Sequence, residues 1–308
     1  MSATFYAFGE ILWDCLPSGR HAGGAPFNVA AHLSQLGVSA SLISAVGKDP
    51  LGDEILAVAR DKGVDTRLVL RSTRNLPTGT VEATIDARGN ATYVIVQPVA
   101  WDEIQVPGDS LPAIGRATGL IYGSLAARSH HNIGQLQRLL ALPGPMKFFD
   151  VNLRPPFADP TLVVSLAKRA DVVKLNDDEV GRLARWLRTG EAKLDTPRTE
   201  SAIAEACAVL SEATHASRIC VTRGSHGAAL WQQGELVSVP APSVVVKDTV
   251  GAGDAFTAGL MVGLTAGRQV RDVLEHACRL GAFVASQNGA IPLFPPELVA
   301  PVAPSPQA

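Results

Sequence analysis

A turn of small residues near the end of the chain, followed directly by an apolar run, constrains the fold most. Residues 246–256 read VKDTVGAGDAF, and the apolar run continues through residue 265. The alternation before the turn predicts a strand, and the run after it predicts a buried helix. Gly251, Ala252 and Gly253 let a ligand approach the backbone closely, because almost no side chain stands in the way. A helix that begins here presents unpaired N–H groups and the positive end of its dipole, so the turn is typical of an anion site.

Asp254 is the charged residue of this turn. A carboxylate beside an anion site can accept the proton of a hydroxyl that attacks a phosphoryl group. The alternative is a glycine turn whose first-turn aspartate is favoured only by the helix dipole.

The composition narrows the class of protein. The 308 residues are 46% hydrophobic and 18% charged, which fits one large α/β domain over residues 1–300 with a small appendage. The net charge of −2, with no block of Lys or Arg, disfavours nucleic acid and anionic membranes as partners. The four scattered cysteines indicate reduced thiols, not a disulfide frame or a zinc site. With no secretory signal pattern and no apolar run of about 18 residues, we expect a cytoplasmic protein.

Apolar runs alternate with helical stretches along most of the chain, which predicts an α/β fold with a mainly parallel sheet. The expected strands are residues 5–13, 39–46, 120–123, 147–151, 171–175 and 218–221, followed by a hairpin of residues 228–231 and 235–239. The expected helices are residues 52–62, 132–142, 162–169, 178–187, 201–214 and 270–287. Residues 188–198 read as a surface loop, and residues 301–308 as a flexible tail.

Between the expected helix at residues 52–62 and the expected strand at residues 120–123, the sequence pattern changes to short strands. Residues 67–71, 78–86 and 91–96 alternate as short strands, and the last two are joined by Ala87-Arg88-Gly89-Asn90, a hairpin signal. Clustered strands inside an α/β chain predict a small projecting sheet, here called the lid, built from about residues 12–22 and 66–100. The alternative is an antiparallel extension of the main sheet.

Candidate sugar ligands lie near the N-terminus. Asp14 ends the first expected strand, where α/β proteins bind ligands, and its carboxylate can accept two sugar hydroxyls; a solvated loop Asp is the alternative. Gly23 and Gly24 allow close backbone approach, and Pro26 fits the first turn of a helix. Asn28 follows in that turn with an amide that can donate to and accept from a polyol, although a simple helix start explains it equally.

Polar side chains also follow the later strands. Asp150, Asn152 and Arg154 occupy alternate positions and hence one face. Asn176 and Glu179 are three apart at a helix start, so they can converge on a hydrated Mg²⁺ or on phosphate-bridging waters. Glu179 can instead be the capping partner of Asn176.

A glycine-rich turn, residues 222–227, follows the next strand. Its hydroxyls and its cation suit nucleotide phosphates, and the residues concerned are Thr222, Arg223, Gly224 and Gly227. The sequence has no G-x-x-x-x-G-K-[ST] motif and no G-x-G-x-x-G after the first strand, which removes the main support for a P-loop or an NAD-binding fold.

Two of these motifs resemble the signatures of the ribokinase/PfkB-like carbohydrate kinases: GG-x-x-x-N at residues 23–28 and DTVGAGD at residues 248–254. The N-x-x-E of residues 176–179, the T-x-G-x-x-G of residues 222–227 and the expected lid are similar too, so the resemblance spans most of the chain. Residues 9–14 (GEILWD), 23–28 (GGAPFN) and 150–154 (DVNLR) look most like the fructokinase branch.

The resemblance implies a Rossmann-like, three-layer sandwich (ribokinase-like) with a β-sheet lid, and ATP-dependent phosphorylation of a sugar hydroxyl. In the transfer step, it implies that Asp254 is the base and that the anion hole is formed by the amides of Gly251, Ala252, Gly253 and Asp254. It implies that the sugar is bound by Asp14, Gly23, Gly24 and Asn28, and that Arg154 contacts the sugar or the phosphate.

The resemblance also implies that Asn176 and Glu179 bind Mg²⁺ through water and that the nucleotide is bound by Thr222, Arg223, Gly224 and Gly227. A monovalent cation such as K⁺ is expected at Asp248, with carbonyls near residues 288–290.

Two departures from the family pattern bear on the substrate. Arg223 stands where lysine is more usual, which changes the geometry of phosphate pairing. Ala25 and Pro26 replace a polar or cationic pair, so the loop offers no partner for a substrate phosphate, and a free sugar, fructose first, is expected. A 2-keto-3-deoxy-sugar-acid kinase, a nucleoside kinase and a catalytically silent sugar-binding protein remain alternatives. The exposed edge of the lid predicts a homodimer in which lids meet.

Overall fold

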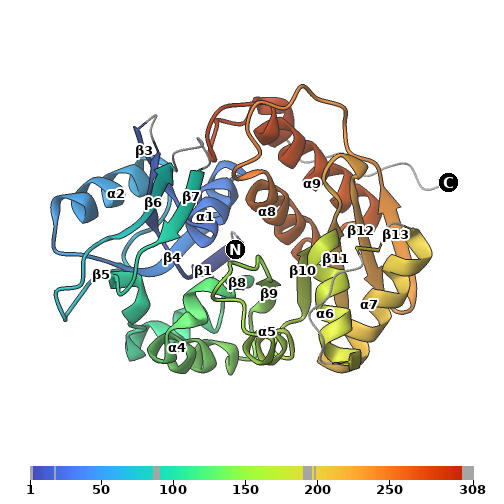
Figure 1. Ribbon diagram of the computed structural model, residues 1–308, viewed down its shortest axis with the longest axis horizontal. Coiled ribbons are helices and arrows are strands. Elements are labelled where there is room, and N and C mark those ends of the chain that lie inside the picture. Colours follow the sequence, from blue (N-terminus) through green and yellow to red (C-terminus); the bar gives the residue numbers. More distant parts are fainter. Residues whose placement is uncertain (1–2, 17–18, 86–90, 190–195, 198, 300–308) are drawn as a thin grey trace.

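Nine strands form one large sheet in a computed structural model that describes residues 3–16, 19–85, 91–189, 196–197 and 199–299 (Figure 1). The strand order is β13-β12-β11-β10-β9-β8-β1-β4-β5. Neighbours from β11 to β5 pair in parallel, and β12 and β13 add an antiparallel hairpin. The strands are β1 (Thr4–Phe8), β4 (Ser39–Val46), β5 (Val69–Arg71), β8 (Gly119–Gly123), β9 (Met146–Asp150), β10 (Val172–Asn176), β11 (Arg218–Thr222), β12 (Ala228–Gln232) and β13 (Glu235–Val239).

Helices cover both faces of this sheet, which confirms the expected three-layer α/β fold (Figure 1). One face carries α1 (Ala25–Gln35), α2 (Pro50–Asp61), α8 (Ala252–Thr265) and α9 (Val270–Ala285). The other carries α4 (His130–Leu140), α5 (Pro160–Ala167), α6 (Asp177–Thr189) and α7 (Glu200–Thr214). The short helices α3 (Leu111–Ile114) and α10 (Pro296–Val299) and the 3₁₀ turns η1 (Ala100–Glu103), η2 (Gly108–Ser110), η3 (Leu125–Arg128) and η4 (Gly224–His226) complete the described elements. Because both faces are covered, the central strands are mainly apolar, and polar side chains such as Asp150 and Asn176 lie at their carboxyl ends.

A separate four-stranded sheet, the small sheet, has the order β3-β2-β6-β7. Its strands are β2 (Leu12–Leu16), β3 (Gly19–Gly23), β6 (Gly79–Ile85) and β7 (Ala91–Ile95). The antiparallel pairing of β6 with β7 confirms the expected hairpin, whose turn at residues 87–90 lies outside the described residues. The expected tail at residues 301–308 and most of the expected loop at residues 188–198 lie outside them as well.

Three expectations about strands are wrong. The expected lid includes residues 66–71, but β5 pairs with β4 in the large sheet. The single strand expected at residues 5–13 is two strands, because the chain turns at Gly9, with φ of 149°, and passes from the large sheet to the small one. Asp14 therefore lies within β2 and not after a strand. No strand precedes Gly251: residues 240–250 run as a loop, and the amides of Lys247 and Asp248 both donate to the carbonyl of Ala285.

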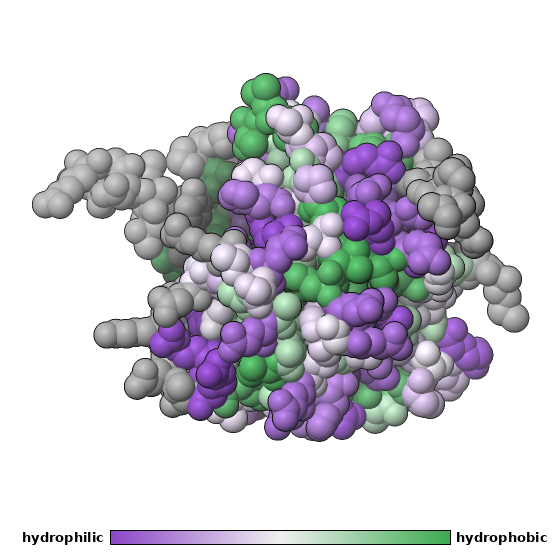
Figure 2. Space-filling model, turned by 90° about the vertical axis from the view of Figure 1, so that its right-hand side faces the viewer, coloured by the Kyte–Doolittle hydropathy of each residue, from purple (hydrophilic) through white to green (hydrophobic). Residues whose placement is uncertain are grey.

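Apolar side chains also lie on the surface of the described part of the protein. No helix among the described residues is long and apolar enough to cross a membrane. Figure 2 shows the right-hand side of the view in Figure 1, where hydrophobic side chains gather near the centre of the face between hydrophilic ones. The outer strand β13 lies at this side, and its Leu236 and Val237 pack against the core from partly buried positions.

Candidate active site

The glycine turn at the start of α8 is built as an anion site. Gly251 caps the helix in the left-handed region, with φ of 79°, and a Cβ there would overlap the backbone of Ala290. The first intrahelical bond runs from the amide of Ala255 to the carbonyl of Gly251 (2.9 Å). The amides of Gly253 and Asp254 lie before that bond, at the positive end of the helix, where an anion binds favourably.

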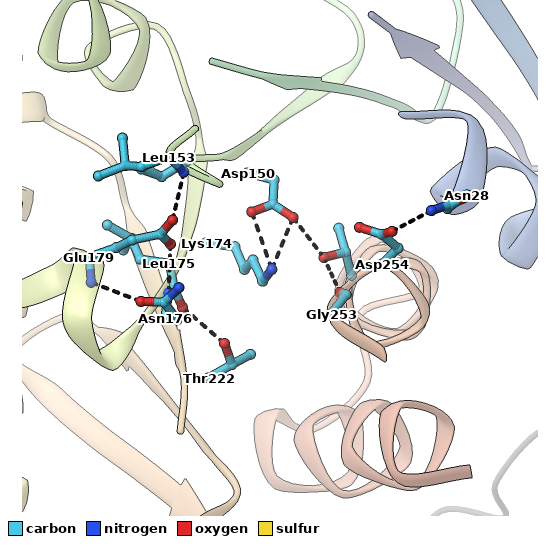
Figure 3. Close-up of polar contacts among 12 residues, drawn as sticks. Asn28, Asp150, Leu153, Lys174, Leu175, Asn176, Glu179, Thr222, Gly253 and Asp254 are labelled. Carbon is cyan, nitrogen blue, oxygen red and sulfur yellow. Dashed lines mark hydrogen bonds and ion pairs between the residues drawn. The ribbon is translucent and has the colours of Figure 1, made fainter. Parts of the chain in front are cut away.

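Asp254 stands in the first turn of α8 and is held from α1. The side-chain amide of Asn28 donates to its carboxylate over 2.8 Å, and Asn28 is only 4% exposed (Figure 3). Burial raises the pKa of Asp254 to about 6; the Asn28 bond and the charges of Lys174 and Arg154 oppose the rise, and Asp150 adds to it. A carboxylate with this pKa is ionised at neutral pH and can still bind a proton.

The other expected sugar ligands lie in the N-terminal part of the chain, on and after β2. Asp14 on β2 faces Gly23 on β3 so closely that a Cβ on this glycine would overlap the carboxylate. Gly24, with φ of 110°, has no room for a Cβ beside the backbone of Glu10. Burial raises the pKa of Asp14, and the charge of Arg154 acts on both Asp14 and Asp254. The structure thus brings Asn28 of the N-terminal motif into contact with Asp254, and Arg154 near enough for its charge to act on both aspartates.

Glu10 is a functional candidate that sequence reasoning missed. It is 4% exposed, and its Oε2 atom has no hydrogen-bond partner among the described residues. Burial raises the pKa of Glu10 to about 7; the charge of Arg154 lowers it, and that of Asp254 raises it. The available signal is a single carboxylate inside the apolar run of residues 5–13.

A buried network below the turn was also missed (Figure 3). The Lys174 ammonium on β10 contacts both carboxylate oxygens of Asp150 on β9, at 3.0 and 3.2 Å. Two acceptors lie within reach of the single hydroxyl hydrogen of Thr257 on α8, the Asp150 carboxylate (3.2 Å) and the carbonyl of Gly253 (2.8 Å). The network therefore joins two central strands to the first turn of α8.

On the other side of this network, β10 and β11 end together, with Asn176 paired to Thr222. The Glu179 carboxylate accepts from the amides of Leu153 (2.7 Å) and Asn176 (2.9 Å), and the Asn176 side chain accepts from the amide of Glu179 (2.8 Å). These are the contacts of the capping alternative. Each oxygen of Glu179 accepts one backbone bond and keeps a second lone pair, which fits a contact with Mg²⁺-bound water.

The glycine-rich turn after β11 closes this edge of the site. Gly224 and Gly227 have φ of 53° and 88°, and a Cβ on Gly227 would overlap the carbonyl of Val239. The amide of Arg223 donates to the carbonyl of Gly227 over 2.8 Å, which fixes the turn beside Thr222.

Asp248 lies next to the loop named for the monovalent cation. Its carboxylate accepts from the amides of Val250 (3.0 Å) and Gly289 (3.2 Å). The Ala290 carbonyl bonds to His32 Nε2 over 3.0 Å. Within the described part of the chain, no three His, Cys, Asp or Glu side chains group to hold a metal ion, so a cation here would depend on carbonyls and water.

Comparison with known proteins identifies the family of this chain. Residues 17–297 match the model of the pfkB family of carbohydrate kinases. A fructokinase of Escherichia coli is 29% identical over 96% of this chain and 97% of its own length. The structure of a Pyrococcus horikoshii sugar kinase in complex with ATP is similar with a TM-score of 0.74 and 26% identity, over 93% of this chain and 94% of that one. An Arabidopsis thaliana ribokinase complexed with ribose and ATP shares the fold, with a TM-score of 0.79 and 23% identity, over 97% and 99% of the two chains. With the anion turn and its carboxylate in place, the chain belongs to the pfkB family of carbohydrate kinases.

Proposed function

We propose that the protein transfers the γ-phosphoryl group of ATP to a hydroxyl of a free sugar, with fructose as the first candidate. The observation that carries this proposal is the Asp254 carboxylate, held by Asn28 at the N-terminus of α8. In the step, the attacking O–H bond breaks and its proton passes to Asp254. The sugar oxygen bonds to the γ-phosphorus, and the bond from that phosphorus to the bridging oxygen breaks, leaving ADP. The first-turn amides offset the negative charge that develops.

The substrate is expected to be neutral. Ala25 and Pro26 supply no cation for a substrate phosphate. Arg154 is the cation available for a substrate carboxylate, but its charge already acts on Glu10, Asp14 and Asp254. The three protein carboxylates leave little net positive charge for a sugar acid. Similarity to the E. coli fructokinase supports fructose within this class.

Magnesium and a monovalent cation complete the proposal. Mg²⁺ neutralises phosphate charge during the transfer. Asn176 and Glu179 would orient its water ligands, and Thr222, Arg223, Gly224 and Gly227 would line the nucleotide phosphates. Asp248 and the carbonyls of residues 288–290 would bind K⁺.

An ADP-release assay with ATP and Mg²⁺ tests this function across fructose, ribose, adenosine, 2-keto-3-deoxygluconate and fructose 1-phosphate, with K⁺ or Na⁺ present. We expect the highest kcat/KM for fructose and faster turnover with K⁺. A higher kcat/KM for another member of the panel would overturn the proposed substrate but not the proposed mechanism. ATP binding without turnover on any of them would favour the silent sugar-binding alternative.

The small sheet suggests how the protein assembles and moves. It has open edges at β3 and β7, which fits a dimer formed through this sheet and a lid that closes over the sugar. Sedimentation of the full chain tests the dimer. Four free cysteines fit the reducing cytoplasm that we propose as its location.

A further inference from the structure

One buried cation lies directly below the catalytic turn and has no part in the roles given above. The side chain of Lys174 is 12% exposed, and its Nζ atom bonds to both oxygens of Asp150. A Cβ placed on Gly253 would stand 3.4 Å from this Nζ. The ammonium therefore lies close to the backbone of the anion turn.

Three carboxylates act on this single ammonium. Asp150 bonds to the Nζ atom directly, and the negative charges of Glu179 and Asp254 also act on it. Glu179 belongs to the phosphate side of the site and Asp254 to the sugar side. Lys174 is thus the charged group that both sides share (Figure 3).

Asp150 and Thr257 fix where this charge lies. Asp150 accepts from Lys174, and the hydroxyl of Thr257 lies within hydrogen-bond reach of both Asp150 and the carbonyl of Gly253. A displacement of the ammonium would break bonds that reach into the first turn of α8.

We propose that Lys174 is a positioning residue of the transfer step, whose ammonium, held by Asp150 below the first turn of α8, supplies the fixed positive charge between the base and the phosphate side. The inference rests on the proposed function. The ammonium favours the ionised form of Asp254 before the proton transfer, against the opposing charge of Asp150, and offsets the negative charge of the arriving phosphoryl group. It takes no proton itself.

A purely structural ion pair would explain the same contacts, so the test must measure how the charge of Lys174 affects the pKa of Asp254. The groups that act on this carboxylate from the surrounding elements are Glu10, Asn28, Asp150, Arg154 and Lys174. The pKa of Asp254 is measured in the free protein by ¹³C NMR with labelled aspartate, and the resonance is assigned with Asp254→Asn.

Two variants keep the hydrogen bonds and change the charge in opposite senses. Lys174→Gln retains a donor for Asp150, and we expect it to raise the pKa of Asp254 by about one unit, since a nearby opposite charge shifts a pKa by about 1–3 units. Asp150→Asn retains an acceptor for Lys174, and we expect it to lower the pKa of Asp254. The matched control, Lys168→Gln at an exposed position, leaves the pKa unchanged.

Turnover supplies the second measurement. We expect Lys174→Gln to lower kcat by about tenfold or more while KM for the sugar changes little, and Lys174→Arg to recover part of the loss. In the pH profile of kcat/KM, we expect the acid limb to move to higher pH in Lys174→Gln and to lower pH in Asp150→Asn.

An unchanged pKa of Asp254 in both variants, or a shift in the same direction, overturns the inference. If only one variant folds, its shift alone decides. The NMR titration needs neither sugar nor ATP, so it still decides the role of Lys174 if the wild-type protein phosphorylates no sugar, a result that would overturn the proposed function instead.

Discussion

Replacing Asp254, the proposed base, should make the protein more stable at neutral pH. Burial raises the pKa of Asp254 from 3.8 to about 6, so an ionised Asp254 costs the folded state up to about 3 kcal/mol at pH 7. Asp254→Asn removes this cost and keeps an acceptor for Asn28. It loses a favourable helix-dipole interaction of about 0.3–1 kcal/mol. We therefore expect Asp254→Asn to be about 2 kcal/mol more stable than the wild type at pH 7, while its turnover falls by orders of magnitude.

The pH dependence of the free energy of unfolding provides a second check on this expectation. Because the folded pKa lies above the unfolded one, the native state takes up a proton as the pH falls through about 6, and the wild type gains stability down to the unfolded pKa near 3.8. Urea unfolding at pH 7 and pH 4 should show the advantage of Asp254→Asn shrinking towards zero. Asp109→Asn, at an exposed position, serves as control. A variant that is less stable than the wild type at pH 7, or an advantage independent of pH, would refute the reasoning.

Three further outcomes are expected. Gly251→Ala should cost more than about 2 kcal/mol in urea unfolding, because the new Cβ meets the backbone of Ala290 at a φ that favours glycine; a neutral result would contradict the geometry of the turn. Asp14→Asn should raise KM for the sugar by about tenfold and leave KM for ATP unchanged in steady-state kinetics, and equal changes in both would exclude Asp14 as a sugar ligand. Glu179→Leu should lower the thermal midpoint by breaking the bonds to the amides of Leu153 and Asn176, and should raise the Mg²⁺ concentration needed for half-maximal turnover; loss of stability with unchanged Mg²⁺ dependence would leave Glu179 with the capping role alone.

Local sequence patterns predicted much of the fold. The alternation of buried strands and amphipathic helices predicted an α/β fold with a mainly parallel sheet, because a strand covered on both faces and a helix covered on one differ in periodicity. The three layers were implied by the family resemblance. Periodicity cannot say which sheet a strand joins. The run of residues 5–13 is apolar except at Gly9 and Glu10, and such an interruption does not show whether the strand continues or the chain passes to a second sheet. For the same reason, β5 was assigned to the lid although it pairs with β4.

The site was predictable where a motif is contiguous and not where it is assembled by the fold. The turn at Gly251 and its carboxylate could be read from adjacent residues. The bond between Asn28 and Asp254 joins positions 226 residues apart, so Asn28 was assigned to the sugar alone. The pairing of Asp150 with Lys174 depends on the register of β9 against β10, which the sequence does not express.

The most direct test of the central claim is to observe the transferred phosphoryl group itself. The wild-type protein and Asp254→Asn are incubated with ATP, Mg²⁺, K⁺ and fructose, and the products are followed by ³¹P NMR. We expect the wild type to form a sugar-phosphate resonance in step with ADP, and Asp254→Asn to form none on the same timescale. A sugar phosphate formed equally by both proteins would contradict the role of Asp254, and ADP formed with inorganic phosphate alone would contradict transfer to the sugar.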